Sequence, residues 1–408
     1  MNDVETAVTR AHHDEWARVV AALTRRFGDL DIAEEAAAEA FATAVERWPA
    51  DGVPPNPGAW LTTTAVRKAI DRIRRESKRD DKHKEAQMVY DSTPPEPLGA
   101  IDDDRLRLIF TCCHPALAME ARLALTLRMV GGLTVPEIAR AFLVAESAMG
   151  QRITRAKAKI KAARIPYRMP SAEDLPARVT GVLGVLFLVF NEGYLATGSD
   201  TDPVRHDLTA EAIRLTRLIR ALLPEDGEVA GLLALMLLIE ARRTARVSAG
   251  GELVALDEQD RGAWDKALIA EGHRLVRERL AAGVAPGRYQ ILAAINAVHT
   301  CARDVRDTDW SQILALYDQL VRLDPSPVIA LNRAVAVAEL DGPEVALAAV
   351  DRLEHRLAGY HAYHATRADL LRRLGRGQQS LAAYDKALEL AGNTAETAYL
   401  TRRRGQLR

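Results

Sequence analysis

Two segments with helical spacing and many lysine and arginine residues lie on either side of an acidic segment that prolines interrupt. The first basic segment is Trp60–Lys84, and the second is Leu133–Ile160 with its basic residues continuing to Lys161. Residues 90–104 between them contain three prolines and five acidic residues. Proline lacks the amide hydrogen that a helix needs, so this segment is expected to be an extended, negatively charged linker. The pattern predicts two helical parts joined by a linker at residues 81–104.

The charge of the chain is segregated along its sequence. The formal net charge is only −1, because acidic residues elsewhere balance the two basic segments. Positive charge concentrated on two helices is typical of a protein that contacts nucleic acid at two places. A basic helix alone is more often an ordinary solvated surface, so this interpretation depends on both segments together.

Composition favours an all-α protein of several domains. A chain of 408 residues is expected to hold about two to four domains. Alanine, leucine and arginine dominate, and only 5% of residues are aromatic, which favours helices over sheets. The apolar stretches Val182–Phe190 and Val229–Ile239 are shorter than the roughly 17 residues that span a bilayer, so they predict buried core helices and no membrane contact. Three cysteines in this length predict a reducing, cytoplasmic environment.

The first basic segment follows an amphipathic stretch with an acidic side. Its apolar stripe has the spacing of a helix from Ile32 to Trp48 and consists of Ile32, Ala36, Ala40, Phe41, Ala44, Val45 and Trp48. The carboxylates Asp31, Glu34, Glu35 and Glu39 are predicted to face mostly away from it. Prolines and glycines from Pro49 onward predict a rigid loop, Ala50–Gly58, with the helix resuming near Ala59.

The second basic segment has the pattern of a helix-turn-helix. Thr134 and Glu137 match a capping box, and Pro136 lies where its missing amide hydrogen does no harm. A short turn at 143–145 leads to a helix that places apolar residues on one side: Met149, Ile153, Ala156 and Ile160. Ala145 offers no side-chain cap to this second helix. Two short helices and a tight turn are typical of a motif that enters the DNA major groove.

The C-terminal hundred residues contain a weak internal repeat. Tyr317, Val350 and Tyr384 begin similar apolar patterns about 34 residues apart, which is the period of tetratricopeptide repeats. Such an array offers a concave surface that accepts a peptide or another part of the same chain.

The first 165 residues or so resemble a bacterial RNA polymerase sigma factor of the extracytoplasmic-function class. The stretch Asp31–Trp48 is similar to the helix with which that class binds core polymerase, Trp60–Arg75 to its −10-reading helix, and Leu133–Ile160 to its −35-reading helix-turn-helix. Two further stretches, Asp102–Pro115 and Phe190–Tyr194, resemble the subfamily numbered forty-two, which carries a tetratricopeptide-like extension.

The resemblance implies four parts. They are sigma region 2 at 4–80, the linker at 81–104, sigma region 4 at 105–168 and a helical regulatory domain at 174–408. It implies binding to the β′ clamp helices of core polymerase and to promoter DNA. It also leaves room for an intramolecular contact between the C-terminal domain and the sigma domains.

The resemblance also assigns roles to residues. Those expected to bind polymerase are Asp31, Glu34, Glu35 and Glu39. Those expected at the −10 element are Asn56, Trp60, Arg67, Lys68, Arg72 and Arg75. Those expected at the −35 element are Ser147, Gln151, Arg152, Arg155, Lys157 and Lys159. Of the basic residues further along the helix, Lys157, Lys159 and Lys161 are assigned to phosphates. Gly150 stands where a basic residue is common, so −35 base preference does not transfer.

The remaining candidate sites favour packing over chemistry. Side chains of Cys112, Cys113 and His114 diverge by about 100° per residue on a helix, so they cannot close a tetrahedral metal site alone. Asn191–Tyr194 is more consistent with a buried hydrogen bond than with a catalytic group. We therefore expect no metal, no cofactor and no enzyme activity. The alternative that remains is a helix-turn-helix regulator that binds an operator and senses a peptide through its repeats, which would not need Asp31–Trp48 or Trp60–Arg75.

Overall fold

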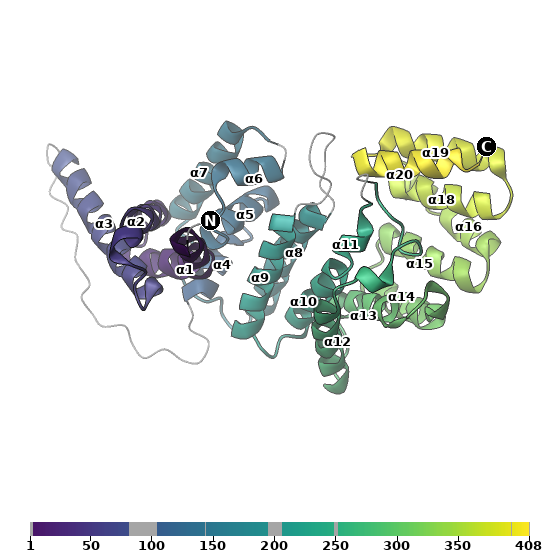
Figure 1. The fold of residues 1–408 in the computed structure, drawn as a ribbon, viewed down its shortest axis with the longest axis horizontal. Helices are drawn as coiled ribbons and strands as arrows, with labels where there is room; N and C mark the ends of the chain where they lie inside the picture. The colour runs from purple at the N-terminus through teal and green to yellow at the C-terminus, as the bar shows by residue number, and fades with distance from the viewer. Residues whose placement is uncertain are drawn as a thin grey trace. The chain divides into compact units, whose positions relative to one another are not determined.

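The computed structural model describes residues 3–80, 104–142, 144–194, 206–248, 252–392 and 394–407. Within these ranges every regular element is helical, apart from one isolated bridge between Val247 and Leu253, so the predicted all-α class is confirmed (Figure 1). The chain divides into two units, Met1–Leu186 and Phe187–Arg408. The predicted linker, residues 81–104, lies almost wholly outside the described residues; only Asp104 is described, as the first residue of a helix.

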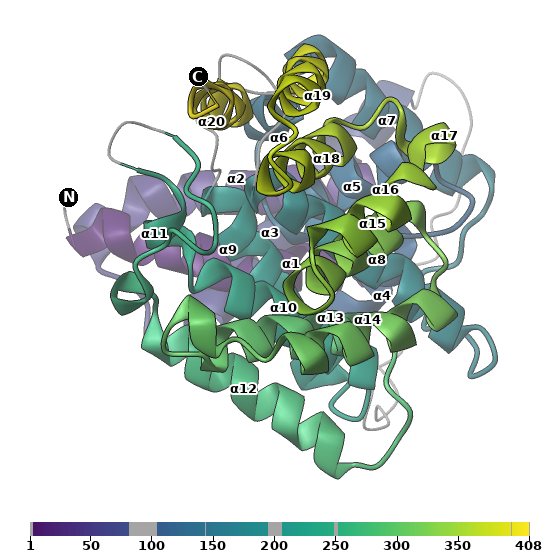
Figure 2. The same ribbon diagram turned by 90° about the vertical axis from the view of Figure 1, so that its right-hand side faces the viewer.

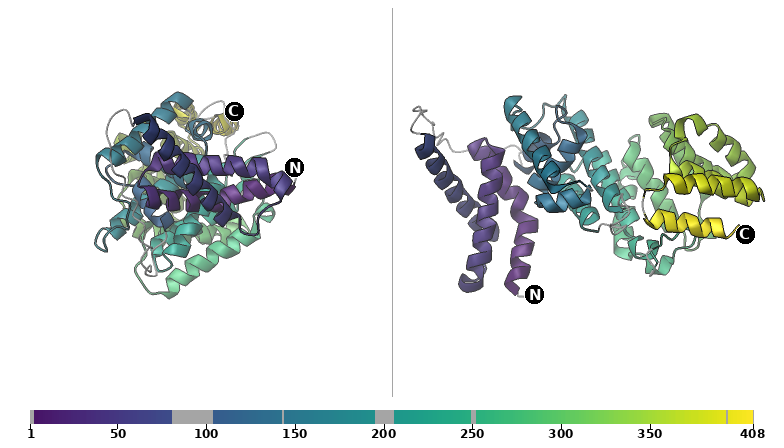
Figure 3. Two further views of the ribbon diagram at one scale, coloured as in Figure 1. Left: turned by 90° about the vertical axis from the view of Figure 1, so that its left-hand side faces the viewer. Right: turned by 90° about the horizontal axis from the view of Figure 1, so that it is seen from above.

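The first unit begins with three long helices that pack on one another, α1 (Asp3–Phe27), α2 (Leu30–Asp51) and α3 (Pro57–Asp80) (Figure 3). Their shared core is apolar and fully buried at Val20, Leu23, Ala37 and Leu61. The predicted stripe of α2 is buried at most of its positions, but Val45 is 57% exposed, so its placement in the core was wrong.

The helix α2 does not end before Pro49, as the sequence predicts, but continues to Asp51. Pro49 lies in the last turn, where a proline removes one backbone hydrogen bond. The amide of Gly52 still donates to the carbonyl of Trp48 at 3.0 Å, so the turn closes around it. The loop between α2 and α3 is therefore shorter than the predicted loop, Ala50–Gly58, since α3 also starts as early as Pro57.

Five short elements follow in the first unit. They are α4 (Asp104–Cys112), α5 (Met119–Leu125), the π-helical turn η1 (Thr126–Val130), α6 (Val135–Ala141) and α7 (Glu146–Ala162). Both α4 and η1 pack against α1. The indole Nε1 of Trp16 on α1 donates to the carbonyl of Met129 at 3.1 Å, inside the core. Gly132, at φ +76°, follows η1, and a Cβ atom there would lie 2.8 Å from His12 and 3.0 Å from Trp16, so a glycine lets the two segments approach.

The helix α8 (Leu175–Tyr194) spans the boundary between the units. It is longer than the predicted apolar stretch, and by length and composition alone it meets the criterion for a membrane span, which core helices of water-soluble proteins also meet. Seven of its apolar side chains are buried: Val179, Val182, Leu183, Val185, Leu186, Val189 and Phe190. This burial agrees with the predicted core helix.

The second unit is a succession of helices. The first group is α9 (His206–Leu222), α10 (Gly227–Glu240), α11 (Arg243–Arg246), the 3-10 turn η2 (Arg261–Ala263), α12 (Lys266–Ala281) and α13 (Arg288–Cys301). The helix α10 is apolar on all sides and buried from Val229 to Leu238, as predicted, and α9, α12 and α13 surround it.

The remainder of the second unit stacks as antiparallel helices (Figure 2). They are the 3-10 turn η3 (Val305–Asp307), α14 (Trp310–Leu323), α15 (Pro327–Leu340), α16 (Pro343–Asp351), α17 (Glu354–Leu357), α18 (His361–Arg373), α19 (Gly377–Leu390) and α20 (Thr394–Gly405). The helices α14, α16 and α19 start 33 and 34 residues apart. Tyr384, predicted to lie in a repeat core, is 2% exposed.

Candidate nucleic-acid interface

The helix-turn-helix is built as the sequence predicts. The Thr134 amide donates to Oε2 of Glu137 at 2.6 Å, and the Glu137 amide donates to the Thr134 hydroxyl at 3.4 Å. This reciprocal pair starts α6. The first residue before α7, Ala145, gives no side-chain cap, also as predicted.

The helix α7 has one apolar and one polar side. Met149, Ile153, Ala156 and Ile160 are buried, as predicted. Residues three and four apart share a helix face, and the exposed face contains four of the predicted −35 residues: Ser147, Gln151, Arg155 and Lys159. Arg152 is half-buried beside them. This row of polar and basic side chains, which we call the α7 face, can reach bases with its N-terminal half and phosphates with its C-terminal half.

The residues predicted at the −10 element fall into three groups. Arg67 and Arg75 on α3 are exposed. Asn56 and Trp60 both have structural contacts, since the Asn56 side chain accepts from the Ala59 amide at 3.0 Å and the Trp60 ring packs edge-on against buried Trp48, with 5.6 Å between ring centroids. The contacts leave the predicted roles of Asn56 and Trp60 untested.

The other two basic residues of α3 pair with carboxylates of α2. Lys68 lies 3.8 Å from Glu39, and Arg72 forms an ion pair with Glu35. All four side chains are between 33% and 45% exposed, so water screens both pairs. Candidate DNA-binding cations and candidate polymerase-binding acids are thus direct neighbours.

Glu34 does not face solvent, which corrects the prediction of an outward-facing acidic residue. Its side chain is 11% exposed. Oε1 accepts from Nε of Arg128 at 2.5 Å, and Oε2 pairs with Nζ of Lys157. Burial alone would raise the pKa of the Glu34 carboxyl, but Lys157 and Arg128 outweigh that effect and hold its pKa below the ordinary value.

Lys157 is the second correction, because it was predicted to touch DNA phosphates. Its side chain is only 9% exposed and its Nζ also lies 2.8 Å from Oδ1 of Asp31. We call Asp31, Glu34, Arg128 and Lys157 the Glu34 cluster. One turn further along α7, Lys161 pairs with Asp29 at 3.0 Å. In this structure α7 therefore neutralises one end of α2 instead of presenting Lys157 to a ligand.

Sequence reasoning missed the partners that hold these two helices together. Arg128 lies in η1, 94 residues from Glu34, and Lys157 lies 123 residues away. The hydroxyl of Tyr167 lies within hydrogen-bond distance of the carbonyls of Ala21 at 3.0 Å and Asp104 at 2.9 Å and can donate its one hydrogen to either, which ties the segment after α7 to α1 and α4. Nothing in local periodicity marks these contacts.

Two of the three cysteines behave as packing groups here. Cys112 and Cys113 are buried free thiols, as predicted, and burial raises the pKa of Cys113 to about 11. Among the described residues no three His, Cys, Asp or Glu side chains form a cluster that could hold a metal ion. At the end of α8, the Arg246 guanidinium lies over the ring of Tyr194 and donates to its carbonyl. The Asn191–Tyr194 segment thus takes part in a partly buried hydrogen bond, with the Tyr194 carbonyl as the acceptor.

Comparisons with known proteins agree with this organisation. Residues 13–79 match sigma-70 region 2, and residues 107–160 match sigma-70 region 4. Residues 178–280 match a family of unknown function, DUF6596. An uncharacterized protein of Rhizobium meliloti (strain 1021), R00370, is 45% identical over 389 residues, which cover 94% of this chain and 92% of that protein. No solved structure matches the chain.

Proposed function

We propose a function on the following basis. This chain belongs to the same family as R00370. With its sigma-70 regions 2 and 4 it is an RNA polymerase sigma factor, which acts with core polymerase and promoter DNA. We propose that it is of the extracytoplasmic-function class, in the subfamily numbered forty-two. Its α7 face would read the −35 element, and α3 with the preceding loop would hold the −10 element. The exposed row on α7, next to a correctly capped α6, supports this proposal most directly.

The proposed polymerase-docking surface is the acidic side of α2. Asp31, Glu35 and Glu39 remain its accessible carboxylates, whereas Glu34 is buried in the Glu34 cluster. Docking on the clamp helices would then compete with the ion pairs that α3 and α7 make to the same carboxylates. Run-off transcription with purified core polymerase tests the proposal, and a protein that never supports promoter-dependent initiation would contradict it.

Replacing Arg152 by alanine should weaken promoter binding by the holoenzyme by about 1–3 kcal/mol, since a base or phosphate contact of the α7 face is lost.

Lys159→Ala should weaken binding to all sequences equally and reduce the dependence of log K on log salt by about 1. Electrophoretic mobility shift over a salt series measures both. Arg352→Ala, at the C-cap of α16 in the other unit, is the matched control and should change neither. Unchanged binding by the first two variants would show that the groove contacts are misplaced.

We further propose that the second unit is a tetratricopeptide-like regulatory domain. The spacing of 33 and 34 residues between the starts of α14, α16 and α19 supports this assignment. A broad hollow of 790 Å³ over α14, α15 and α18 provides space for a ligand or peptide.

Removal of residues 174–408 should leave a folded N-terminal half, because the Glu34 cluster and the hydrogen-bonding contacts of the Tyr167 hydroxyl lie before residue 174. Its promoter output in run-off transcription should differ from that of the full chain at equal polymerase occupancy. Equal output would count against a regulatory domain, and an unfolded product would instead show that α8 is needed for the first unit.

A further inference from the structure

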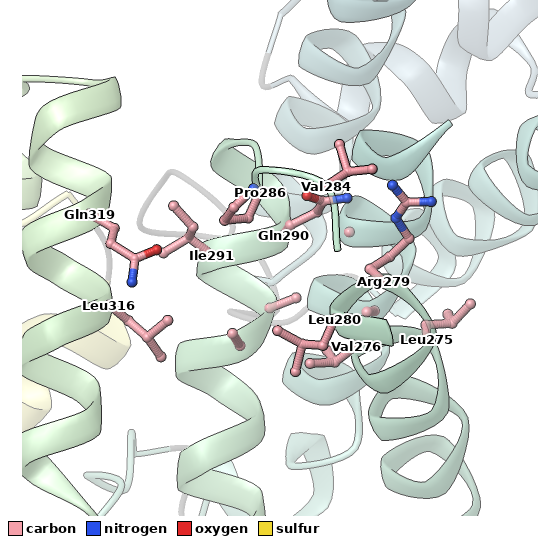
Figure 4. Close-up of a pocket in the computed structure, with 14 residues that line it drawn as sticks. Leu275, Val276, Arg279, Leu280, Val284, Pro286, Gln290, Ile291, Leu316 and Gln319 are labelled. Carbon is pink, nitrogen blue, oxygen red and sulfur yellow. The ribbon is translucent and has the colours of Figure 1, made fainter. Parts of the chain in front are cut away.

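The second unit contains a narrow apolar slot lined by α10, α12, α13, α14 and the loop between α12 and α13, which Figure 4 shows in close-up. Its volume is 160 Å³. Val276 and Leu280 project from α12, Ile291 from α13 and Leu316 from α14, while Val284 belongs to the loop above them. A cavity of about 150 Å³ holds one benzene molecule, so this slot has room for one large apolar side chain.

The rim of the slot is unusually exposed for apolar residues. Leu280 is 70% exposed and Val284 is 64% exposed, the two highest values among the large hydrophobic side chains of the described residues. A second hollow of 470 Å³ shares Val276, Leu280 and Ala294 with the slot and continues along α12 and α13 to Cys301. The slot is therefore the deep end of a groove, and exposed apolar surface of this kind marks an interaction site.

The shape and lining of the groove favour a helix as its occupant. Strand addition needs a free sheet edge, and the described residues contain no sheet. Proline-rich segments dock on aromatic-lined grooves, yet neither hollow is lined by Phe, Tyr or Trp. A groove between two helices with one deep apolar slot suits the apolar face of an amphipathic helix.

The charge around the groove indicates which kind of side chain flanks the apolar face of the bound helix. Arg279 is the only ionisable residue that lines the slot, and Arg277 and Arg303 line the rest of the groove. None of the three forms an ion pair with a described residue, and Nε of Arg279 is buried without a hydrogen-bond partner among those residues. Two acidic residues also line the groove, Asp307 and Asp309, but Asp309 is occupied in capping α14. Unpaired arginines beside an apolar slot complement a helix with acidic flanks.

We propose that the groove between α12 and α13 binds an amphipathic helix of a protein partner, with one large apolar side chain in the slot and acidic side chains against Arg277 and Arg279. The inference goes beyond the proposed sigma function and does not depend on it.

Selection of peptides from a displayed library of helix-forming 16-mers against the full-length chain tests the proposal. The enriched peptides should share apolar residues at positions i, i+4 and i+7 next to Asp or Glu. Fluorescence anisotropy then measures their affinity for the wild type and variants. Leu280→Glu should weaken binding at least tenfold. Leu323→Glu, at the matching end of α14 and 55% exposed, is the control and should bind as the wild type does.

A charge swap makes the test specific. Arg277→Glu should weaken binding of the acidic peptides, and a peptide with lysines in place of its acidic residues should recover affinity for that variant alone. Circular dichroism establishes that each variant is folded. Enriched peptides without the pattern, or equal affinity for the Leu280 and Leu323 variants, would overturn the proposal. So would sedimentation showing that the chain dimerises and that Leu280→Glu abolishes the dimer, because the occupant would then be a second copy.

Discussion

Replacing Glu34 by glutamine is expected to lower the free energy of unfolding of the first unit by about 3 kcal/mol, the low end of what losing one member of a buried ion pair costs. The low end applies because Lys157 keeps Asp31 as a partner. The physical cause is the loss of the carboxylate between two cations: Arg128 would remain largely buried without its carboxylate partner, and Lys157 would keep only the exposed Asp31. Thermal and urea unfolding, followed by circular dichroism, measure the loss.

Two comparisons separate this effect from a general loss of charge. Glu35→Gln removes a carboxylate that is 45% exposed and should cost less than about 1 kcal/mol. Adding Lys157→Met to Glu34→Gln should cost much less than the sum of the two single changes, since the pair is already broken. Additive costs would show that Glu34 and Lys157 do not stabilise each other.

The dependence of stability on pH gives an independent check of the same cluster. The pKa of Glu34 is lowered in the folded protein, so its ionised form contributes stability that is fully present above the unfolded-state pKa, near 4.5. That contribution is lost as the pH falls through the lower, folded-state pKa. The wild type should therefore lose more stability than Glu34→Gln between pH 5 and pH 3, and parallel curves would contradict the assignment.

Gly231→Ala is expected to destabilise the second unit by about 3 kcal/mol, the upper end of overpacking costs. A Cβ atom at this position would lie 2.6 Å from the backbone nitrogen of Gln290 and 2.9 Å from its Cα. Backbone atoms cannot rotate away as a side chain can, so α10 and α13 would have to separate. Because α10 is the buried centre of this part of the unit, the strain spreads to α9 and α12.

A matched glycine elsewhere gives the control for this change. Gly181 lies within α8, and a Cβ atom there would meet nothing within 4 Å. Gly181→Ala should therefore stabilise the protein by about 0.5–1 kcal/mol through helix propensity. Denaturant unfolding compares the two variants, and a stabilising Gly231→Ala would show that α10 and α13 are not in such close contact.

Local patterns were sufficient to predict several of the described helices, including α2, α3, α7 and α10. Some features can be recognised from residues that are close together in the sequence. These are the capping box at Thr134, the apolar row of α7 and the uninterrupted apolar run of α10. The predicted end of α2 at Pro49 was wrong, because a proline in the last turn of a helix removes only one backbone hydrogen bond and does not end the helix there. Val45 was wrongly placed in the core, because the predicted apolar stripe of α2 was wider than the surface of α2 that α1 and α3 cover.

The candidate site was predictable only in part, for a physical reason. The α7 face follows from periodicity, since its exposed residues are those that the apolar row leaves over. The environment of Glu34 and Lys157 does not, because each is an ordinary surface residue of its own helix and is buried by a helix more than a hundred residues away. Family resemblance assigned both to external partners, whereas here they bind each other.

The positions of the three cysteines have a practical consequence. Cys112 and Cys113 are enclosed and hard to deprotonate, whereas Cys301 is open to solvent on the wall of the α12–α13 groove. Thiolate is the reactive species, so an alkylating reagent applied to the native protein is directed to that third thiol. The chain thus carries its own attachment point for a fluorescent reporter, placed where an arriving helix would change the dye's surroundings.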